Sequence, residues 1–261
     1  MKGSVLVTGG ARRIGRAICE MLAARGWRVL AHSRDPDNPL HADLALPGEA
    51  DRLFAAAVRE APDLCAVVNN AAMFSTAAEL PADEAATIQT VNVTTPMRLT
   101  ELLATYLAER HAAGSVVNLL DTRILIDFWA EQDHREIVEH KRLTPYAASK
   151  LALARATLDQ ARHLAPALRV NGVAPGPVLP PADAACREKG GDILLPRRPL
   201  PADVASAVVF LLEAEAVTGQ VLAVDSGQCL LKPDLWYTRV ASRRGPRNTM
   251  SRQQVERNRR W

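Results

Sequence analysis

The sequence predicts an α/β protein with one doubly wound domain, in which helices cover both faces of a parallel sheet of about seven strands. Three observations support this fold class. Short apolar runs rich in β-branched residues alternate with longer segments of helical periodicity. The runs are apolar throughout rather than at every second position, as in strands buried on both faces. The first run leads directly into a glycine-rich turn and a helix. We assign residues 1–230 to this domain and residues 231–261 to a basic C-terminal extension.

Each element follows from a local pattern. The expected strands are Val5–Val7, Arg28–Ala31, a short run near His41–Leu44, Ala66–Val68, Ser115–Leu120, Arg169–Ala174 and Gln220–Asp225. The helix after the first strand is predicted by an apolar stripe at i, i+4, i+7 and i+8 that ends at Gly26. Two later stripes predict further helices: Leu99, Leu102, Leu103, Tyr106 and Leu107, then Val204, Ala207, Val208 and Leu211 after Pro201 and Asp203. Between the second and third strands there is room only for a proline-rich loop.

Composition excludes several classes of protein. The chain has 261 residues, of which 48% are hydrophobic and 23% charged, so wholesale disorder is excluded. No apolar stretch approaches the roughly 18 residues that a membrane-spanning helix needs. The four cysteines form no CxxC pair, which argues against a disulfide framework or a structural zinc site. The N-terminus lacks the regions of a signal peptide, and we therefore expect a cytoplasmic protein.

The charge is unevenly distributed along the chain. Residues 231–261 hold nine basic and two acidic side chains, a net charge of +7, which leaves −4 for residues 1–230 out of a total of +3. Charge runs of this kind are usually solvated or lie in a subunit contact. We expect no nucleic-acid partner, although the tail is the one segment that would suit one.

The first turn predicts a Rossmann-type nucleotide site. Strand Val5–Val7 delivers Thr8–Gly15 into a helix, where glycines permit close approach of the backbone to a pyrophosphate at the helix N-terminus. The expected contacts in this loop are Gly9, Arg12, Arg13, Ile14 and Gly15. The alternative interpretation is a glycine-rich turn that only packs.

The end of the second strand favours NADPH over NADH. An NAD site usually places an acidic residue there for the ribose hydroxyls, whereas this chain has Ser33 and Arg34. Guanidinium groups and a hydroxyl suit a 2′-phosphate. Asp43 and Leu44 are expected to bracket the adenine. The alternative is that Arg12, Arg13 and Arg34 are solvated surface residues.

Tyr146 and Lys150 form the candidate catalytic pair. The spacing places both on one helix face, one turn apart. An ammonium group beside a phenol stabilises the phenolate and so brings tyrosine within range for proton transfer.

These motifs together resemble the short-chain dehydrogenase/reductase family over about residues 4–230. The matching segments are Thr8–Gly15, Asp43-Leu44, Asn69–Ala72, Asn92, the Tyr146/Lys150 pair, Asn171–Gly176 and Thr218–Gln220. The resemblance implies that Tyr146 donates a proton and that Lys150 binds the nicotinamide ribose. It implies that Asn92 supports a water relay, that Asn70 and Ala71 line the cofactor site, and that Pro175 and Gly176 cover the nicotinamide. It also implies a homotetramer.

Three residues depart from the common pattern and resemble the pteridine reductases within that family. Arg13 stands where the middle loop glycine is usual, Asp121 stands where the catalytic serine is usual, and Phe74 follows Asn70 by four positions. The resemblance implies that the arginine contacts cofactor phosphate, that Phe74 stacks on a pterin, and that Asp121, Tyr146 and Lys150 perform catalysis. An ionised aspartate only accepts hydrogen bonds, so it suits the N–H edge of a pterin rather than a ketone oxygen. Phe74 as ordinary core packing is the alternative.

The sequence therefore predicts an NADPH-dependent reductase of a small, flat heterocycle. One alternative is a reductase of an aliphatic or acyl ketone, such as a 3-oxoacyl thioester. The other is a nucleotide-binding sensor that contacts nucleic acid through the basic tail. His134 and His140 lie in the charged segment 122–145, but their spacing places them on different helix faces, and we expect no metal site.

Overall fold

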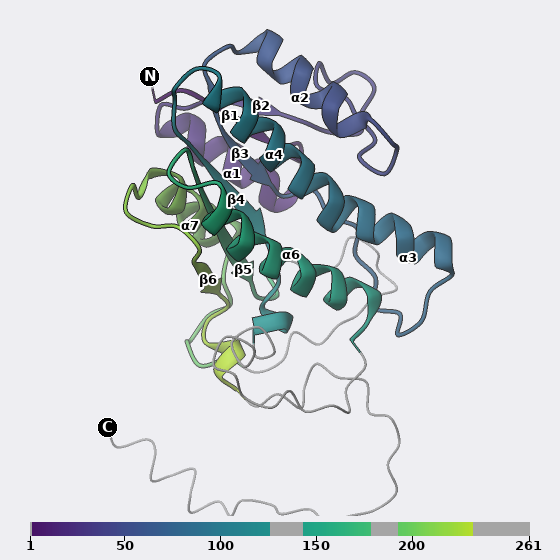
Figure 1. The fold of residues 1–261 in the computed structure, drawn as a ribbon. Helices are drawn as coiled ribbons and strands as arrows, with labels where there is room; N and C mark the ends of the chain where they lie inside the picture. The colour runs from purple at the N-terminus through teal and green to yellow at the C-terminus, as the bar shows by residue number, and fades with distance from the viewer. Residues whose placement is uncertain (1, 126–142, 179–192, 232–261) are drawn as a thin grey trace, which may run out of the picture.

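The computed structural model describes residues 2–125, 143–178 and 193–231, and these residues form one six-stranded parallel sheet (Figure 1). The strand order is β2-β1-β3-β4-β5-β6. The strands are β1 (Ser4–Val7), β2 (Arg28–Ala31), β3 (Leu64–Asn69), β4 (Gly114–Leu119), β5 (Leu168–Pro175) and β6 (Val221–Val224). The predicted fold class, an α/β doubly wound sheet, is confirmed. The proposed boundary at residue 230 stays a prediction, because residues 232–261 lie outside the described part of the chain.

The prediction of a strand near His41–Leu44, the third of the seven expected, is wrong. Residues 41–44 contribute only an isolated bridge between Ser33 and His41. The backbone is used locally instead, since Leu40 N–H donates to the side chain of Asn38 and His41 N–H to its carbonyl oxygen. Turn-forming side chains of this kind compete with a strand ladder for the same backbone groups. The segment nevertheless packs into the core through buried leucine and alanine side chains.

Helices cover both faces of the sheet (Figure 1). The helices are α1 (Arg13–Ala24), α2 (Glu49–Glu60), α3 (Ala82–Gln89), α4 (Thr95–Ala108), α6 (Pro145–His163) and α7 (Pro201–Glu213). Helices α1 and α7 pack together on one face, and α2, α4 and α6 cover the other. The three apolar stripes predicted from the sequence fall in α1, α4 and α7. No described helix is both long and apolar enough to cross a membrane.

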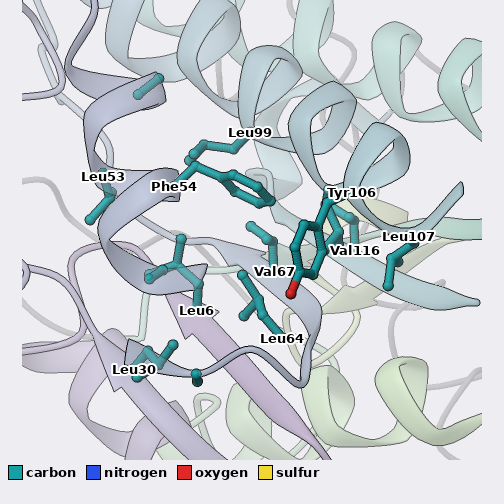
Figure 2. Close-up of a cluster of buried hydrophobic side chains, with 14 of the residues drawn as sticks. Leu6, Leu30, Leu53, Phe54, Leu64, Val67, Leu99, Tyr106, Leu107 and Val116 are labelled. Atoms are coloured by element: carbon teal, nitrogen blue, oxygen red, sulfur yellow. The ribbon is translucent and has the colours of Figure 1, made fainter. Parts of the chain in front are cut away.

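Successive residues of β1 point to opposite faces and join two different cores. Val5 and Val7 pack toward α1 and α7, whereas Leu6 packs toward α2 and α4. Figure 2 shows the second of these cores, where Phe54 and Tyr106 meet edge to face with ring centroids 6.0 Å apart. Each fully buried leucine in such a core stabilises the fold by about 1.5–3 kcal/mol. Burial on both faces explains why the strand is apolar throughout.

Helices α3 and α4 are joined by a single π turn, η1 (Thr90–Thr94), which carries Asn92. Pro96 follows at the start of α4 and has no N–H, so it cannot donate the usual i→i−4 hydrogen bond to the Asn92 carbonyl. Such turns commonly occur at functional sites. This one places Asn92 beside α6, the helix that carries the Tyr146/Lys150 pair.

Candidate active site

A cavity of about 510 Å³ opens at the carboxyl ends of β1, β2 and β3. Strand order reverses beside β1, and this is where doubly wound sheets bind dinucleotides. The predicted residues that line the cavity are Gly9, Arg12, Arg13, Ile14, Gly15, Ser33, Arg34, Asp43, Leu44, Asn70 and Ala71. Three predicted residues lie outside this lining: Pro175 at the end of β5, Gly176 directly after it, and Lys150 on α6.

The glycine loop has the tight geometry that its residues predict. A Cβ on Gly15 would lie 2.1 Å from the carbonyl oxygen of Gly9, so only glycine allows the helix to start this close to the loop. Gly9 has a φ of +65°, and Arg13 has a φ of +54°. A positive φ is unfavourable for a residue with a side chain, and strained residues of this kind cluster at functional sites.

Asn70 stabilises the loop directly. Its side-chain amide donates to the carbonyl oxygens of Thr8 (2.8 Å) and Gly9 (3.1 Å). The backbone amides of Asn70 and Ala71 both donate to the Thr8 hydroxyl at 3.0 Å. These bonds join the end of β3 to the end of β1 and so hold the two sides of the cleft together.

His32 also lines the cavity, and sequence reasoning missed it. The ring lies between the glycine loop and Ala42, with one nitrogen facing each. The available signal was its position, because it stands at the end of the second strand where NAD sites usually have an acidic residue.

Asp121 and Tyr146 meet in space. The Tyr146 hydroxyl donates to Oδ2 of Asp121 at 3.0 Å, across 25 positions of sequence. Asp121 follows β4 and caps the short helix η2 (Thr122–Ile124), where its Oδ1 accepts from the Arg123 amide. Tyr146 lies in the first turn of α6, which Thr144 caps through Ala147 N–H.

Lys150 lies one turn further along α6 and is 2% exposed. Its ammonium group donates to the Leu119 carbonyl oxygen at 2.7 Å and lies 5.9 Å from the Tyr146 ring centroid. Burial lowers the pKa of Lys150 to about 8, and the charge of Asp121 opposes this shift. The ammonium group of Lys150 therefore loses its proton well below the ordinary pKa of 10.5.

The side chain of Asn92 is fully engaged. Its amide donates to the Met73 carbonyl oxygen and to the Ser149 hydroxyl, and its oxygen accepts from Met73 N–H. The side chain thus positions the segment before Phe74 against α6. The predicted role of Asn92 in a water relay stays a prediction.

Phe74 is 45% exposed, which contradicts the alternative of ordinary core packing. Its ring meets the Tyr146 ring edge to face, with centroids 4.8 Å apart and an interplanar angle of 77°. The guanidinium of Arg123 lies 5.2 Å from the Phe74 centroid, and its Nε lies 3.8 Å from Asp121 Oδ1. Arg123 was not identified from the sequence, although it follows Asp121 by only two positions. A cation, a carboxylate, a phenol and an apolar ring therefore adjoin one another.

Asp225 anchors the loop behind Asp121. Its Oδ2 accepts from the Thr122 hydroxyl at 2.6 Å and from Cys229 N–H at 2.7 Å, and its Oδ1 accepts from Gly227 N–H. Burial alone would raise the pKa of Asp225, but hydrogen bonds from Cys229 and Thr122 outweigh burial and lower it. This carboxylate ties the turn after β6 to the loop after β4.

Other candidate groups carry no site in the described chain. Among the described residues, no cluster of histidine, cysteine or acidic side chains could hold a metal ion. His134, His140 and most of the charged segment lie outside the described residues, and so does nearly all of the basic tail.

Comparison with known proteins agrees with this geometry. A family model described as enoyl-(acyl carrier protein) reductase matches residues 9–228, and relatives include proteins named as short-chain dehydrogenases and reductases. The chain belongs to the short-chain dehydrogenase/reductase family of oxidoreductases, whose fold binds a nicotinamide cofactor.

The names of individual relatives fall into two groups. The solved structure of FolM alternative dihydrofolate reductase 1 from Brucella canis, complexed with NADP, superposes with a TM-score of 0.73 at 32% identity, covering 89% of this chain and 97% of that one. The granaticin polyketide synthase putative ketoacyl reductase 2 of Streptomyces violaceoruber is 32% identical, over 87% of this chain and 96% of that protein. The 3-oxoacyl-[acyl-carrier-protein] reductase FabG of Thermotoga maritima is 27% identical, over 87% and 98%.

Proposed function

We propose that this protein is an NADPH-dependent reductase of a pterin-like heterocycle. The observation that carries the proposal is the hydrogen bond from Tyr146 to Asp121 beside the exposed ring of Phe74. A ketone reductase needs a hydrogen-bond donor next to the tyrosine, whereas a carboxylate there accepts. The similarity to a FolM dihydrofolate reductase supports the same substrate class.

The residues divide the work as follows. Tyr146 gives its hydroxyl proton to the nitrogen of a C=N bond, whose π electrons form the new N–H bond. Asp121 accepts hydrogen bonds from the N–H edge of the ring and holds the tyrosine hydroxyl in place. Phe74 offers an apolar face against which a flat ring stacks. Lys150 stabilises the phenolate that remains. When bound, NADPH supplies the hydride that adds to the carbon of the C=N bond.

The cleft fits the phosphorylated cofactor better than NADH. Arg12, Arg13 and Arg34 line it together with Ser33, and no carboxylate stands at the end of β2. Guanidinium groups bind phosphate with paired N–H donors, and this supports recognition of a 2′-phosphate. The bound dinucleotide in the FolM structure is also NADP.

A substrate panel tests the proposal. NADPH oxidation is measured with dihydrobiopterin, dihydrofolate, simple ketones and a 3-oxoacyl thioester. Reduction of a pterin substrate with no comparable ketone activity is the expected result. Phe74→Ala should raise the KM for the pterin through loss of a stacking contact worth about 0.5–1.5 kcal/mol, while Phe74→Tyr, which keeps the ring, serves as its control.

The second candidate is reduction of an acyl ketone. The names of the ketoacyl reductase relatives favour it. In that case ketones in the panel would be reduced, pterins would not, and Asp121 would not contact the carbonyl.

The resemblance to the family supports the expectation of a homotetramer. The location in the cytoplasm that was expected from the sequence also stays a prediction. Light scattering of the purified chain tests the first, and fractionation of the source cells tests the second.

A further inference from the structure

His32 is a buried histidine that touches both sides of the nucleotide cleft. It follows β2 and is 2% exposed. Its Nδ1 lies 3.1 Å from the backbone nitrogen of Gly9, in the glycine loop. Its Nε2 lies 3.0 Å from the carbonyl oxygen of Ala42, directly before Asp43 and Leu44.

The partners of the ring determine its protonation state. A backbone amide can only donate, so Nδ1 must accept the hydrogen bond from Gly9. A carbonyl oxygen can only accept, so Nε2 must carry the proton. Both bonds therefore require the neutral ring with its hydrogen on Nε2. A protonated ring would turn an N–H toward the N–H of Gly9.

The surroundings of His32 favour the neutral ring. The charged and titratable side chains on the neighbouring segments include Arg12, Arg13, Arg34, Asp35, His41 and Asp43. On α2, Arg52 pairs with Glu49. Asp43, which precedes this helix, accepts from Ala45 N–H. Burial lowers the pKa of His32 from its ordinary value of 6.5, and the charges of His41, Arg52 and Arg34 lower it further, against the raising effect of the bond to Ala42.

We propose that neutral His32 is a positioning residue of the dinucleotide site, which holds the glycine loop through Gly9 and the adenine-side segment through Ala42 in the geometry that receives the cofactor. Gly9 has a φ of +65°, so its orientation depends on the bonds around it. Replacement of one bond by a donor–donor contact moves the loop that meets the pyrophosphate. The role of His32 concerns the dinucleotide cleft and does not depend on the pterin substrate. The proposed role of His32 and the proposed substrate can therefore be contradicted independently of each other.

The direction of the pH effect follows from the lowered pKa. At neutral pH the ring is neutral and both bonds are present. As the pH falls below 6.5 toward the lowered pKa, His32 gains a proton, the bond from Gly9 is lost, and dinucleotide affinity falls.

Two substitutions separate the two bonds. In His32→Asn the side-chain oxygen lies near the place of Nδ1 and keeps the bond from Gly9. In His32→Gln the amide nitrogen lies near the place of Nε2 and keeps the bond to Ala42. Neither side chain titrates. His163→Gln is the matched control, because this histidine is exposed and bonds only to Asp159 of its own helix in the described structure.

The test combines NMR of the histidine rings with calorimetric titration of NADP⁺ and NAD⁺ between about pH 5 and pH 8. NAD⁺ is needed because it lacks the 2′-phosphate, which itself titrates near pH ~6. We expect a neutral Nε2–H ring for His32 at pH 7 and an NAD⁺ affinity that falls as this ring protonates. Each variant lacks one of the two bonds and should bind NAD⁺ about five- to ten-fold more weakly at neutral pH, and neither should show the acid step.

Several results would overturn the proposal. They are an Nδ1–H ring, a His32→Gln protein that binds like the wild type, or a His32→Asn protein with an undiminished acid step. If neither variant folds, the wild-type protein decides, because an NAD⁺ affinity independent of His32 protonation contradicts the proposal. The His163→Gln protein should match the wild type at every pH.

Discussion

The Tyr146 hydroxyl lies 3.0 Å from Oδ2 of Asp121, and the same carboxylate accepts from the amide of Arg123 through its other oxygen. Each oxygen of Asp121 thus has a fixed partner, and the phenol is oriented before any substrate arrives. Preorganisation of this kind is what places a catalytic proton within reach of its acceptor.

Replacement of the phenol removes the proton donor. Tyr146→Phe should slow turnover by at least about a hundred-fold while NADPH affinity is nearly unchanged, because the hydroxyl contacts Asp121 and not the cleft lining. Steady-state kinetics and fluorescence titration measure the two quantities. If the variant keeps most of its activity, Tyr146 is not the donor.

Asp121→Ser restores the residue that is common in the family at this position. We expect pterin turnover to fall by at least about ten-fold, since a neutral hydroxyl replaces the charged, two-oxygen acceptor for the N–H edge. Asp121→Asn is the control that keeps the shape of the side chain. Its pterin turnover should also fall, because the side-chain NH₂ group donates hydrogen bonds where the aspartate oxygen accepts them. Equal or higher pterin turnover in Asp121→Ser would remove the basis for the pterin substrate.

The pKa of Lys150, lowered by burial to about 8, predicts a pH dependence of activity and of stability. Activity (kcat/KM) should decline as the pH rises through about 8, because the ammonium that stabilises the phenolate is lost. The free energy of unfolding changes in the opposite direction and increases with pH. The folded chain releases this proton before the unfolded chain does, so folding gains free energy between about pH 8 and the ordinary value of 10.5.

The substitution Lys150→Met removes the titrating amine and so isolates the contribution of Lys150 to the pH dependence of stability. The Tm of the wild-type protein without cofactor, measured relative to this variant, should rise across the same interval. A constant difference between the two proteins would mean that Lys150 titrates at its ordinary value.

Cofactor selectivity is expected to depend on the end of β2. NADPH should bind at least ten-fold more tightly than NADH, which corresponds to about 1.4 kcal/mol. The double substitution Ser33→Asp and Arg34→Ala should reverse this order, because a carboxylate there repels the 2′-phosphate and accepts from ribose hydroxyls. Equal affinity of the wild-type protein for both dinucleotides, by calorimetry, would contradict the assignment.

The sequence predicted those parts of the molecule that depend on local pattern. The loop of Gly9 and Gly15 and the pairing of Tyr146 with Lys150 are set by spacing within one turn or one helix. The run at residues 41–44 was mistaken for a strand because its apolar residues do face the core, although turns at Asn38 use its backbone.

Contacts between distant segments could not be predicted from local sequence patterns. Arg123 lies against Phe74 across 49 positions, and His32 contacts Gly9 across 23 positions. Asp225 reaches Thr122 across 103 positions. No periodicity records such contacts, because they arise only when strands that are far apart in sequence lie side by side in the sheet.

The positive φ of Arg13 has a consequence for how this enzyme can change over generations. Every arginine codon is one base away from a glycine codon, and glycine at this position would relieve the backbone. The same change would remove a guanidinium from the cleft. We therefore expect that this one mutation gives a more stable protein that binds NADPH more weakly. The Tm of Arg13→Gly should rise and its NADPH affinity should fall, and the two changes measure how far stability and cofactor binding oppose each other.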